Sequence, residues 1–512
     1  MNTKRHLALM LMLPLLVFCG GNKNNPEPTP DPDPAISIIG QEEFNWDCTG
    51  GSATLTFSSN SAWTIANDDD WVSVAPDSGE ASDNPIQVTI TCAQNTLAVD
   101  RDTYFQIVSG SIRVPVFVKQ SRDPLSGAAP DFKSGDVLLV TNPLVEKFLT
   151  EVDYPDKTCK EYTKIFDYYG GFDGVNLTWD NWETDWPDGD KPTAFSIRWK
   201  EEDMEEGAMM LHLEDELDWK GDMEISKGSH YVNITNLVPN DKYTYKVTTA
   251  TGKVLAQGNF STTGSLHQVF FHGKVTKKKG VELKGSGARN ARDLGGWTGL
   301  DGKKVKYRKV YRGGRLNEKW SPYPLDAQGQ KEVLFEGIGA QLDLRGNSDV
   351  MFEPAVEGLD HCAPVIEQGG KTMLVSDHAK TKECFEFVVN SVRNNKPVYF
   401  HCSLGRDRTG TLDILLLGLL GVREGVIAKE YEVTYFAPVG YSVSISDKKS
   451  NPIPTFHNTR MAWVYSDVVP YFWELAEETE GKTFAEGVEK YLLEVAGVSQ
   501  KDIDDFRNLM LE

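Results

Sequence analysis

Cysteine is scarce in this chain: seven residues in 512, which excludes a small fold held by a disulfide framework. After the first 19 residues no apolar run is long enough to predict a membrane-spanning helix. Positive charge is the minority, since 53 Lys and Arg stand against 75 Asp and Glu, and the net charge of −22 argues against general nucleic-acid binding. The sequence shows no cluster with metal-ligand spacing, so neither a metal nor another cofactor is expected.

The first 19 residues have the pattern of a bacterial secretion signal. Lys4 and Arg5 give a positive start, and the apolar stretch 7–18 is too short for a permanent membrane helix. The run Leu16-Val17-Phe18-Cys19 resembles a lipobox, which implies lipidation of Cys19; an uncleaved anchor is the alternative. Either way we expect the chain outside the cytoplasm, anchored to a bacterial membrane on its periplasmic or cell-surface side. Residues 20–35, rich in Pro and Asp, predict an extended tether.

Residues 36–121 predict an all-β sandwich, because short runs of alternating apolar and polar residues are separated by Gly, Asn, Asp and Ser. The segments Ser61-Ala62-Trp63 and Asp70-Trp71-Val72-Ser73-Val74 resemble a BACON domain. That resemblance implies either contact with glycans or a spacer role. The tryptophans of both segments occupy strand positions and are expected in the core, so the sequence predicts no exposed aromatic platform. Cys48 and Cys92 are candidates for a disulfide.

Residues 130–264 predict a second β domain. Strand-like runs such as 231–235 precede the segment 237–247, which resembles the second half of a fibronectin type III domain. Residues 134–169 fit less well and are interpreted as an irregular N-terminal extension. The tripeptide Trp186-Pro187-Asp188 matches the loop that supplies the general acid in many tyrosine phosphatases. It lies 402 − 188 = 214 residues before the cysteine discussed next, however, so we interpret it as a turn.

Residues 401–410, His-Cys-Ser-Leu-Gly-Arg-Asp-Arg-Thr-Gly, form the most informative segment of the chain. A β-branched and aromatic run, 397–400, leads in, and an apolar run, 411–417, leads out, which predicts strand, tight loop and helix. The loop N–H groups and the positive end of the helix then make an anion site. Such a field lowers the pKa of the Cys402 thiol, and Arg408 can grip two phosphate oxygens. The pattern predicts phosphoryl transfer through a phosphocysteine.

This segment resembles the H-C-x-x-G-x-x-R-T signature of cysteine-dependent protein tyrosine phosphatases. Its form Gly-Arg-Asp-Arg-Thr-Gly is most similar to a bacterial subgroup with Gly-Lys-Asp-Arg-Thr-Gly, whose members act on phosphotyrosine, phosphoserine or phosphothreonine, and phosphoinositides. The segments 290–296, 311–316 and 341–346 fall where that family has related motifs. Residues 266–512 are therefore expected to form an α/β domain with a central, mainly parallel sheet. Together with the two preceding sandwiches, this predicts a multidomain protein.

The chemistry and the resemblance together predict a role for each residue. Cys402 attacks phosphorus and Arg408 grips the transition state, while His401 orients the loop. The other loop residues are expected to bind phosphate or to assist the thiolate: Ser403, Leu404, Gly405, Arg406 and Thr409. The resemblance implies Asp407 as general acid; Asp377, 402 − 377 = 25 residues upstream, is the alternative, and a helix N-cap is its competing interpretation. Arg406 replaces the usual Lys, which leaves the substrate range open.

Two further groups of residues carry open alternatives. The stretch 303–315 is locally basic, and either attracts inositol phosphates and lipid headgroups or is a solvated strand face. Its basic residues are Lys303, Lys304, Lys306, Arg308, Lys309, Arg312 and Arg315. Cys362 or Cys384 would serve as a resolving thiol for an oxidised Cys402, and both are otherwise buried thiols.

Three functions remain in competition. The first is a lipid-anchored phosphatase for phosphotyrosine or for dual protein substrates, and the second has the same chemistry on phosphoinositides or soluble inositol phosphates. The third is a surface glycan-binding lipoprotein with an inactive phosphatase domain, against which the intact Cys402, Arg408 and Thr409 argue. Sulfurtransferases and arsenate reductases also use a cysteine loop, but the segment 290–296 favours a phosphatase.

Overall fold

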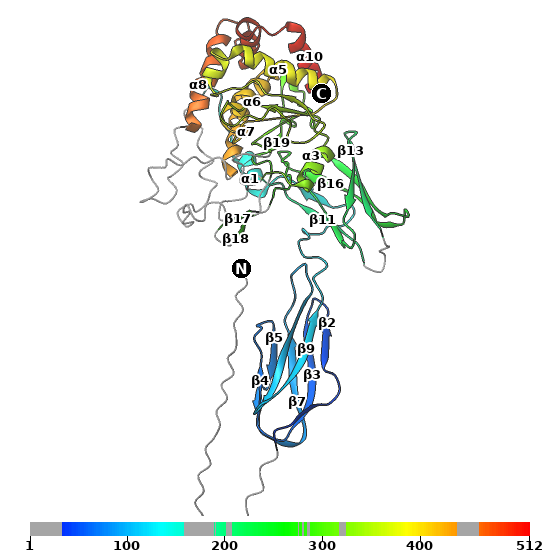
Figure 1. Cartoon of the computed structure of the whole chain (residues 1–512). Helices are drawn as coiled ribbons and strands as arrows, with labels where there is room; N and C mark the ends of the chain where they lie inside the picture. Colours follow the sequence, from blue (N-terminus) through cyan, green and yellow to red (C-terminus); the bar gives the residue numbers. More distant parts are fainter. Residues whose placement is uncertain are drawn as a thin grey trace, which may run out of the picture. The chain divides into compact units, whose positions relative to one another are not determined.

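The computed structural model describes residues 33–157, 189, 191–200, 207–274, 276–278, 281–283, 287–316, 324–437 and 460–512 (Figure 1). The chain divides into two compact units, Met1–Ser126 and Gly127–Glu512. Cys19, the Trp186-Pro187-Asp188 tripeptide and most of the tether lie outside the described residues. Within the described residues, no helix is long and apolar enough to cross a membrane.

The first unit is a sandwich of two mainly antiparallel sheets. One sheet has the order β1 (Ile36–Ile38), β3 (Gly51–Ser59), β7 (Ser82–Cys92), β5 (Val72–Ala75). The other has the order β2 (Glu43–Trp46), β9 (Ile112–Gln120), β8 (Arg101–Ser109), β4 (Trp63–Ala66), β6 (Ser78–Gly79). Alternate residues of these strands point into one core, where Trp63 packs edge-to-face on Phe57 at 4.9 Å between ring centroids.

Two sequence expectations for this sandwich need correction. Cys48 and Cys92 are both free thiols, so the candidate disulfide is not formed. An aromatic pair is exposed, contrary to prediction: Tyr104 and Phe117 are directly opposed on β8 and β9, with 54% and 47% of their surface accessible. The sequence concealed this pair because each ring occupies an ordinary strand position, and only the strand register brings the two together.

The second unit begins with a β domain made of two sheets. Its larger sheet has the order β10 (Val137–Leu139), β16 (Val254–Thr263), β15 (Lys242–Thr249), β12 (Met209–Asp215), β13 (Lys220–Ile225). Its smaller sheet pairs β11 (Phe195–Arg198) with β14 (Tyr231–Ile234). Leu211, Val247 and Phe260 are buried between them.

A helix from the expected N-terminal extension belongs to the next domain's core. Helix α1 (Pro143–Glu151) is capped by the Asn142 side chain, and its residues Val145 and Phe148 are fully buried in the α/β cluster. The Phe148 ring lies 5.7 Å from that of Phe436. The Lys429 ammonium group also donates to two carbonyls of this segment, at 2.9 and 2.8 Å. The segment before the β domain thus completes the α/β domain.

The α/β domain is built on a five-stranded sheet, mainly parallel as predicted. Its order is β19 (Arg292–Asp293), β20 (Val310–Gly313), β23 (Val398–His401), β21 (Ala340–Asp343), β22 (Asp360–Cys362), and β19 alone runs antiparallel to its neighbour among these described strands. Its described α-helices are α3 (Ala327–Phe335), α4 (Lys371–Val375), α5 (His378–Arg393), α6 (Asp407–Leu419), α7 (Glu424–Glu432), α8 (Arg460–Ala476), α9 (Phe484–Lys490) and α10 (Gln500–Met510). Figure 1 shows α5, α6, α8 and α10 grouped around the sheet.

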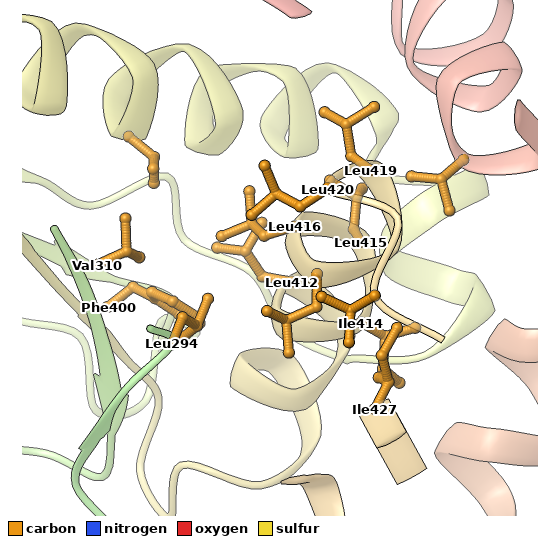
Figure 2. Packing of buried hydrophobic residues seen from close by; sticks show 14 of the residues in the cluster. Leu294, Val310, Phe400, Leu412, Ile414, Leu415, Leu416, Leu419, Leu420 and Ile427 are labelled. Atoms are coloured by element: carbon orange, nitrogen blue, oxygen red, sulfur yellow. The ribbon is translucent and has the colours of Figure 1, made fainter. Parts of the chain in front are cut away.

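Helix α6 is apolar on all sides and lies in the interior for that reason. Residues 409–419 are all buried, and Figure 2 shows Leu412 and Leu416 on the side of the helix nearest Val310 and Phe400 of the sheet, while Leu419 points away from them. Each fully buried leucine contributes about 1.5–3 kcal/mol relative to exposure to water. Close packing therefore fixes the helix whose first turn follows Cys402.

A buried polar network joins the β domain to the α/β domain. Arg308 pairs with Glu336 and with Asp215 of β12, the latter at 3.3 Å, and its guanidinium lies 4.1 Å from the Trp219 ring centroid. Arg308 also donates to the Tyr243 hydroxyl at 3.3 Å. Both alternatives for the basic stretch are therefore wrong for Arg308, which is buried and neutralised, whereas Lys303 and Lys304 are exposed.

Candidate active site

The loop 402–406 starts where three parallel strands end. His401, the last residue of β23, is in register with Gly313 of β20 and with Asp343 of β21, so all three carboxyl ends meet at one edge of the sheet. Ligands of open α/β sheets bind at this edge. Helix α6 begins at Asp407 and directs its positive end to the same place.

Cys402 is 2% exposed, and its thiol is acidified. Burial alone would raise the pKa of this thiol, but the Arg408 guanidinium and hydrogen bonds from the side chain and backbone of Thr409 lower it below its ordinary value. Among the described residues, the Thr409 hydroxyl has no oxygen or nitrogen partner. It is therefore available to the sulfur alone.

Gly405 is the residue on which the loop turns. Its φ of +72° favours glycine, and a Cβ there would lie 2.4 Å from the Gly313 carbonyl carbon. The residue after Gly313 is held as well, because the Tyr399 hydroxyl donates to the Gly314 carbonyl at 2.7 Å. The Gly313-Gly314 pair thus supports the loop from β20 at a distance that side chains would prevent.

Arg312 holds the loop from behind. It is fully buried and donates to the Gly405 carbonyl at 2.7 Å, to Asp413 Oδ2 at 2.6 Å and to Glu430 Oε2 at 2.8 Å. The guanidinium therefore connects the loop, helix α6 and helix α7 at one point. This burial also removes Arg312 from the surface role considered for the basic stretch.

Asn290 and Arg292 complete this support. The Asn290 side chain donates to the same Gly405 carbonyl at 3.1 Å and to the Thr434 hydroxyl at 3.2 Å. Arg292 pairs with the Glu430 carboxylate and donates to the Glu430 carbonyl at 2.8 Å. Asn290 and Arg292 of the segment 290–296 thus help to position the loop 402–406.

The support cluster, made of Arg292, Arg312, Asp413 and Glu430, holds two guanidinium groups and two carboxyl groups. Burial raises the pKa of Asp413, and the neighbouring Glu430 raises it further. Burial also acts to raise the pKa of Glu430, but Arg292 and Arg312 outweigh it and bring that pKa to about 2. The two guanidinium groups lie directly behind the loop, and their positive charge favours an anion there.

His401 contacts the backbone of Cys402. Burial lowers its pKa to about 4, so the imidazole is neutral. Its Nδ1 lies 3.2 Å from the Cys402 carbonyl oxygen, and its Nε2 lies 2.9 Å from the Gln341 side-chain nitrogen. These contacts fix a tautomer with the proton on Nδ1.

The predicted phosphate-binding residues occupy the loop and the first turn of α6. Arg406 is 1% exposed and lies against its neighbour Asp407, with Nε–Oδ1 at 3.0 Å and Nη2–Oδ2 at 3.3 Å. Arg408 is half-buried and donates to the Ile366 carbonyl at 3.0 Å. Ser403 and Leu404 are half-buried at the loop surface.

The alternative acid lies elsewhere in the fold. Asp377 precedes α5, where its carbonyl accepts the Thr381 N–H at 2.9 Å and its carboxylate pairs with Lys380 at 3.4 Å. Within the described residues no hydrogen bond links it to the loop. The structure therefore favours the helix-end interpretation, although Asp377 does not cap with its side chain.

Cys362 and Cys384 are poor resolving thiols. Burial, and then the nearby Glu383, raise the pKa of Cys362 to about 12, and burial raises that of Cys384 as well. A thiol that keeps its proton is a weak nucleophile. The structure thus favours the interpretation of both as structural thiols.

Asp349 is the contact that the sequence did not predict. It lies in the turn after β21, and the Ser403 hydroxyl donates to its carboxylate. Its position six residues beyond strand 340–343 was the available signal, because that strand ends at the edge of the sheet occupied by the loop. Glu430 gave no signal, since its bond to Arg292 spans 138 residues. Among the described residues, no group of His, Cys, Asp and Glu could hold a metal ion.

Comparisons with known proteins agree with this geometry. Residues 283–512 match the model described as "Tyrosine phosphatase family", and residues 61–121 match the BACON binding-domain model. A protein of Cupriavidus necator with the provisional name of tyrosine-protein phosphatase is 28% identical over 167 residues, which cover 28% of this chain. The chain spans 59% of the length of that relative.

The solved structures compared are less similar. A titin immunoglobulin tandem, A164-A165, is 9% identical and covers 44% of this chain and 96% of its own, with a TM-score of 0.18. A Bacteroides ovatus GH5 xyloglucanase is 19% identical and covers 21% of this chain and 27% of its own, with a TM-score of 0.16. Neither likeness carries the functional argument. The motif at 401–410, the geometry of its loop and the matched models agree: the chain carries a tyrosine phosphatase family domain at 283–512, preceded by a BACON domain.

Proposed function

We propose that this protein is a cysteine-dependent phosphatase that hydrolyses phosphate monoesters through a phosphocysteine, with phosphotyrosine or dual protein substrates. The single observation that carries the proposal is the Cys402 thiol, which is buried and acidified at the start of α6. A thiolate facing an anion site is suited to attack on a bound phosphoryl group.

The residues of the loop supply the remaining chemistry. Backbone N–H groups of the loop bind the equatorial phosphoryl oxygens, and Arg408 grips the developing charge with two donors. The Thr409 hydroxyl stabilises the thiolate when it leaves in the second step. The resemblance assigns leaving-group protonation to Asp407, and that assignment stays a prediction.

The experiment is an assay of the mature chain, from Gly20 on, under reducing conditions against a phosphotyrosine peptide, phosphoinositides and phytate. Turnover that survives EDTA and is abolished by vanadate and by Cys402→Ser supports the cysteine mechanism. Absence of turnover on every substrate would refute it. The best substrate decides between protein and inositol phosphates.

The structure weakens one argument for inositol phosphate substrates, the basic stretch 303–315. The stretch contains Arg308 and Arg312, whose charges are buried in ion pairs. Lys303 and Lys304 of the same stretch stay exposed, so the assay with both kinds of substrate makes the choice.

A second function belongs to the BACON domain. We propose that Tyr104 and Phe117 form a glycan-binding platform, because their exposed rings lie side by side with centroids 6.2 Å apart. The flanking Glu43–Lys119 ion pair, at 2.9 Å, offers polar contacts to sugar hydroxyls. Binding of the full chain to a glycan array should be lost in Tyr104→Ala/Phe117→Ala; equal binding by this variant would refute the platform.

We also propose that Cys19 carries a lipid that anchors the protein outside the cytoplasm. Metabolic labelling with a fatty-acid analogue should mark the expressed chain and should fail with Cys19→Ala. Equal labelling of both would contradict the proposal.

A further inference from the structure

Residues 363–370 connect β22 to α4 and pack against the beginning of α6. The Gly370 N–H donates to the Thr411 hydroxyl at 2.7 Å. A Cβ on Gly369 would lie 2.7 Å from the Asp407 carbonyl carbon, so a side chain there would force the two backbones apart. The segment therefore lies directly beside the helix turn that follows the phosphate loop.

Arg408 is held by this segment. Its Nη1 donates to the Ile366 carbonyl at 3.0 Å, and the Ile366 side chain is fully buried in the core of the α/β domain. Among the described residues, this carbonyl alone accepts a hydrogen bond from the guanidinium, so its other N–H groups stay available for phosphoryl oxygens. The position of one backbone carbonyl thus sets the direction in which Arg408 presents its planar fork.

The residue before Ile366 has a strained backbone. Val365 has a φ of +59°, in the left-handed region that a β-branched residue rarely adopts. Such a conformation persists only where the surrounding structure holds it, and it is frequent at functional sites. A return of Val365 to negative φ would redirect the chain at Ile366 and move its carbonyl away from Arg408.

Lys380 of α5 supplies the contact that holds Val365. Its ammonium group donates to the Val365 carbonyl at 2.7 Å and pairs with Asp377 Oδ1 at 3.4 Å. The carboxylate of Asp377 thus directs the lysine side chain toward the strained residue. A partly exposed ion pair of this kind adds little to stability, so the main effect of Lys380 is on the position of residues 365–366.

We propose that Lys380 is a positioning residue for Arg408; the inference rests on the proposed function. By holding Val365 in its strained conformation, Lys380 places the Ile366 carbonyl that directs the guanidinium toward the phosphoryl group. Lys380 itself contacts no substrate, and its effect on the reaction passes through Arg408. Asp377 gains a role as well, because its carboxylate orients the lysine from behind.

The test compares two lysines of α5 that have matched surroundings. The side chains of Lys380 and Lys382 are each 38% exposed, and each donates to one backbone carbonyl at 2.7 Å, that of Gly497 for Lys382. Lys380→Met should lower kcat for 4-nitrophenyl phosphate by about 10- to 100-fold, since a displacement of about 1 Å costs up to about 100-fold. Vanadate affinity should fall in parallel. Lys382→Met should change neither, and Lys380→Arg, which keeps a cationic donor, should restore most of both.

Alkylation of Cys402 by iodoacetamide across a pH series separates positioning from a loss of stability. Burial raises the pKa of this thiol and Arg408 lowers it, so a displaced Arg408 should move the alkylation profile of Lys380→Met to higher pH. A merely structural lysine would lower the urea midpoint and leave the profile unchanged. That result would overturn the inference, as would equal kcat values in Lys380→Met and Lys382→Met.

A double variant tests the strain itself. Addition of Val365→Gly to Lys380→Met should recover part of the lost kcat, because glycine adopts a φ of +59° without strain. A double variant no faster than Lys380→Met would overturn the role given to Val365. Failure of the proposed function would appear separately, as an inactive wild type or an active Cys402→Ser, whereas the alkylation profile needs no turnover.

Discussion

Arg312→Met tests whether the phosphate loop depends on the charge cluster behind it. The substitution keeps a long apolar side chain and removes three hydrogen bonds, to Gly405, Asp413 and Glu430. Removal of one partner from a buried ion pair costs about 3–5 kcal/mol. The loss is a large share of the roughly 5–15 kcal/mol by which domains are stable, so the variant should fold with a clearly lower unfolding midpoint.

The same variant should also change the nucleophile. Without Arg312 the cluster loses one of its two guanidinium charges and the Gly405 carbonyl loses a donor, so the pKa of the Cys402 thiol should rise. Iodoacetamide alkylation of Cys402, followed by mass spectrometry across a pH series, measures this shift, and urea unfolding measures the stability. Lys309→Met is the control, because Lys309 precedes the same strand and forms no ion pair within the described structure. Unchanged stability and an unchanged alkylation profile in Arg312→Met would refute the reasoning.

Three further substitutions have expected outcomes of different kinds. Gly405→Ala places a Cβ 2.4 Å from the Gly313 backbone at a φ of +72°, so vanadate affinity and turnover should both collapse while the core stays folded; normal vanadate binding would contradict this. His401→Gln tests the pH dependence of stability. The pKa of His401 is about 4 in the folded protein, below the ordinary 6.5. The stability that this neutral imidazole contributes is therefore fully present above pH 6.5 and falls by about 3 kcal/mol as the pH drops through about 4. Urea titrations of the variant should lack that acid loss. Phe148→Ala should destabilise the α/β domain by about 3–5 kcal/mol, measured by its unfolding midpoint, and an exposed Leu144→Ala serves as its control.

The local part of the site could be read from the sequence because neighbouring residues determine it. Strand β23, the loop and helix α6 are continuous in the chain, and their apolar runs and the loop glycine each favour the observed conformation. The parallel sheet followed from the same motif. Trp63 was also predicted correctly as a core residue, since its strand position alternates with exposed neighbours.

The features of the fold and the site that the sequence did not predict depend on contacts between distant segments of the chain. Asp349 and Glu430 act through residues 54 and 138 positions away, and no local pattern marks either one. Helix α1 has a sequence compatible with a surface extension, and only the α/β core shows where its apolar side is buried. Arg308 looked like a surface charge because the acidic groups that neutralise it lie in other elements.

The β domain supports the sheet that carries the loop 402–406, and strands β19 and β20 show how. In their register Arg292 is paired with Arg312, and Asp293 with Tyr311, so the two pairs point to opposite faces of the sheet. The arginines hold the phosphate loop. On the other face Asp293 accepts from His267 at 3.0 Å, and Tyr311 donates to Glu336 at 2.8 Å, within the network that reaches the β domain.

Removal of the β domain would therefore leave Arg308 and Glu336 without Asp215, Tyr243 and the Trp219 ring. An exposed ion pair is worth little, and the apolar surface around it would meet water. Displacement of Asp293 and Tyr311 would move the same two strands that position Arg292 and Arg312. The phosphate loop thus depends on a domain that contributes no residue to it, and catalytic competence and attachment of the β domain should be lost together.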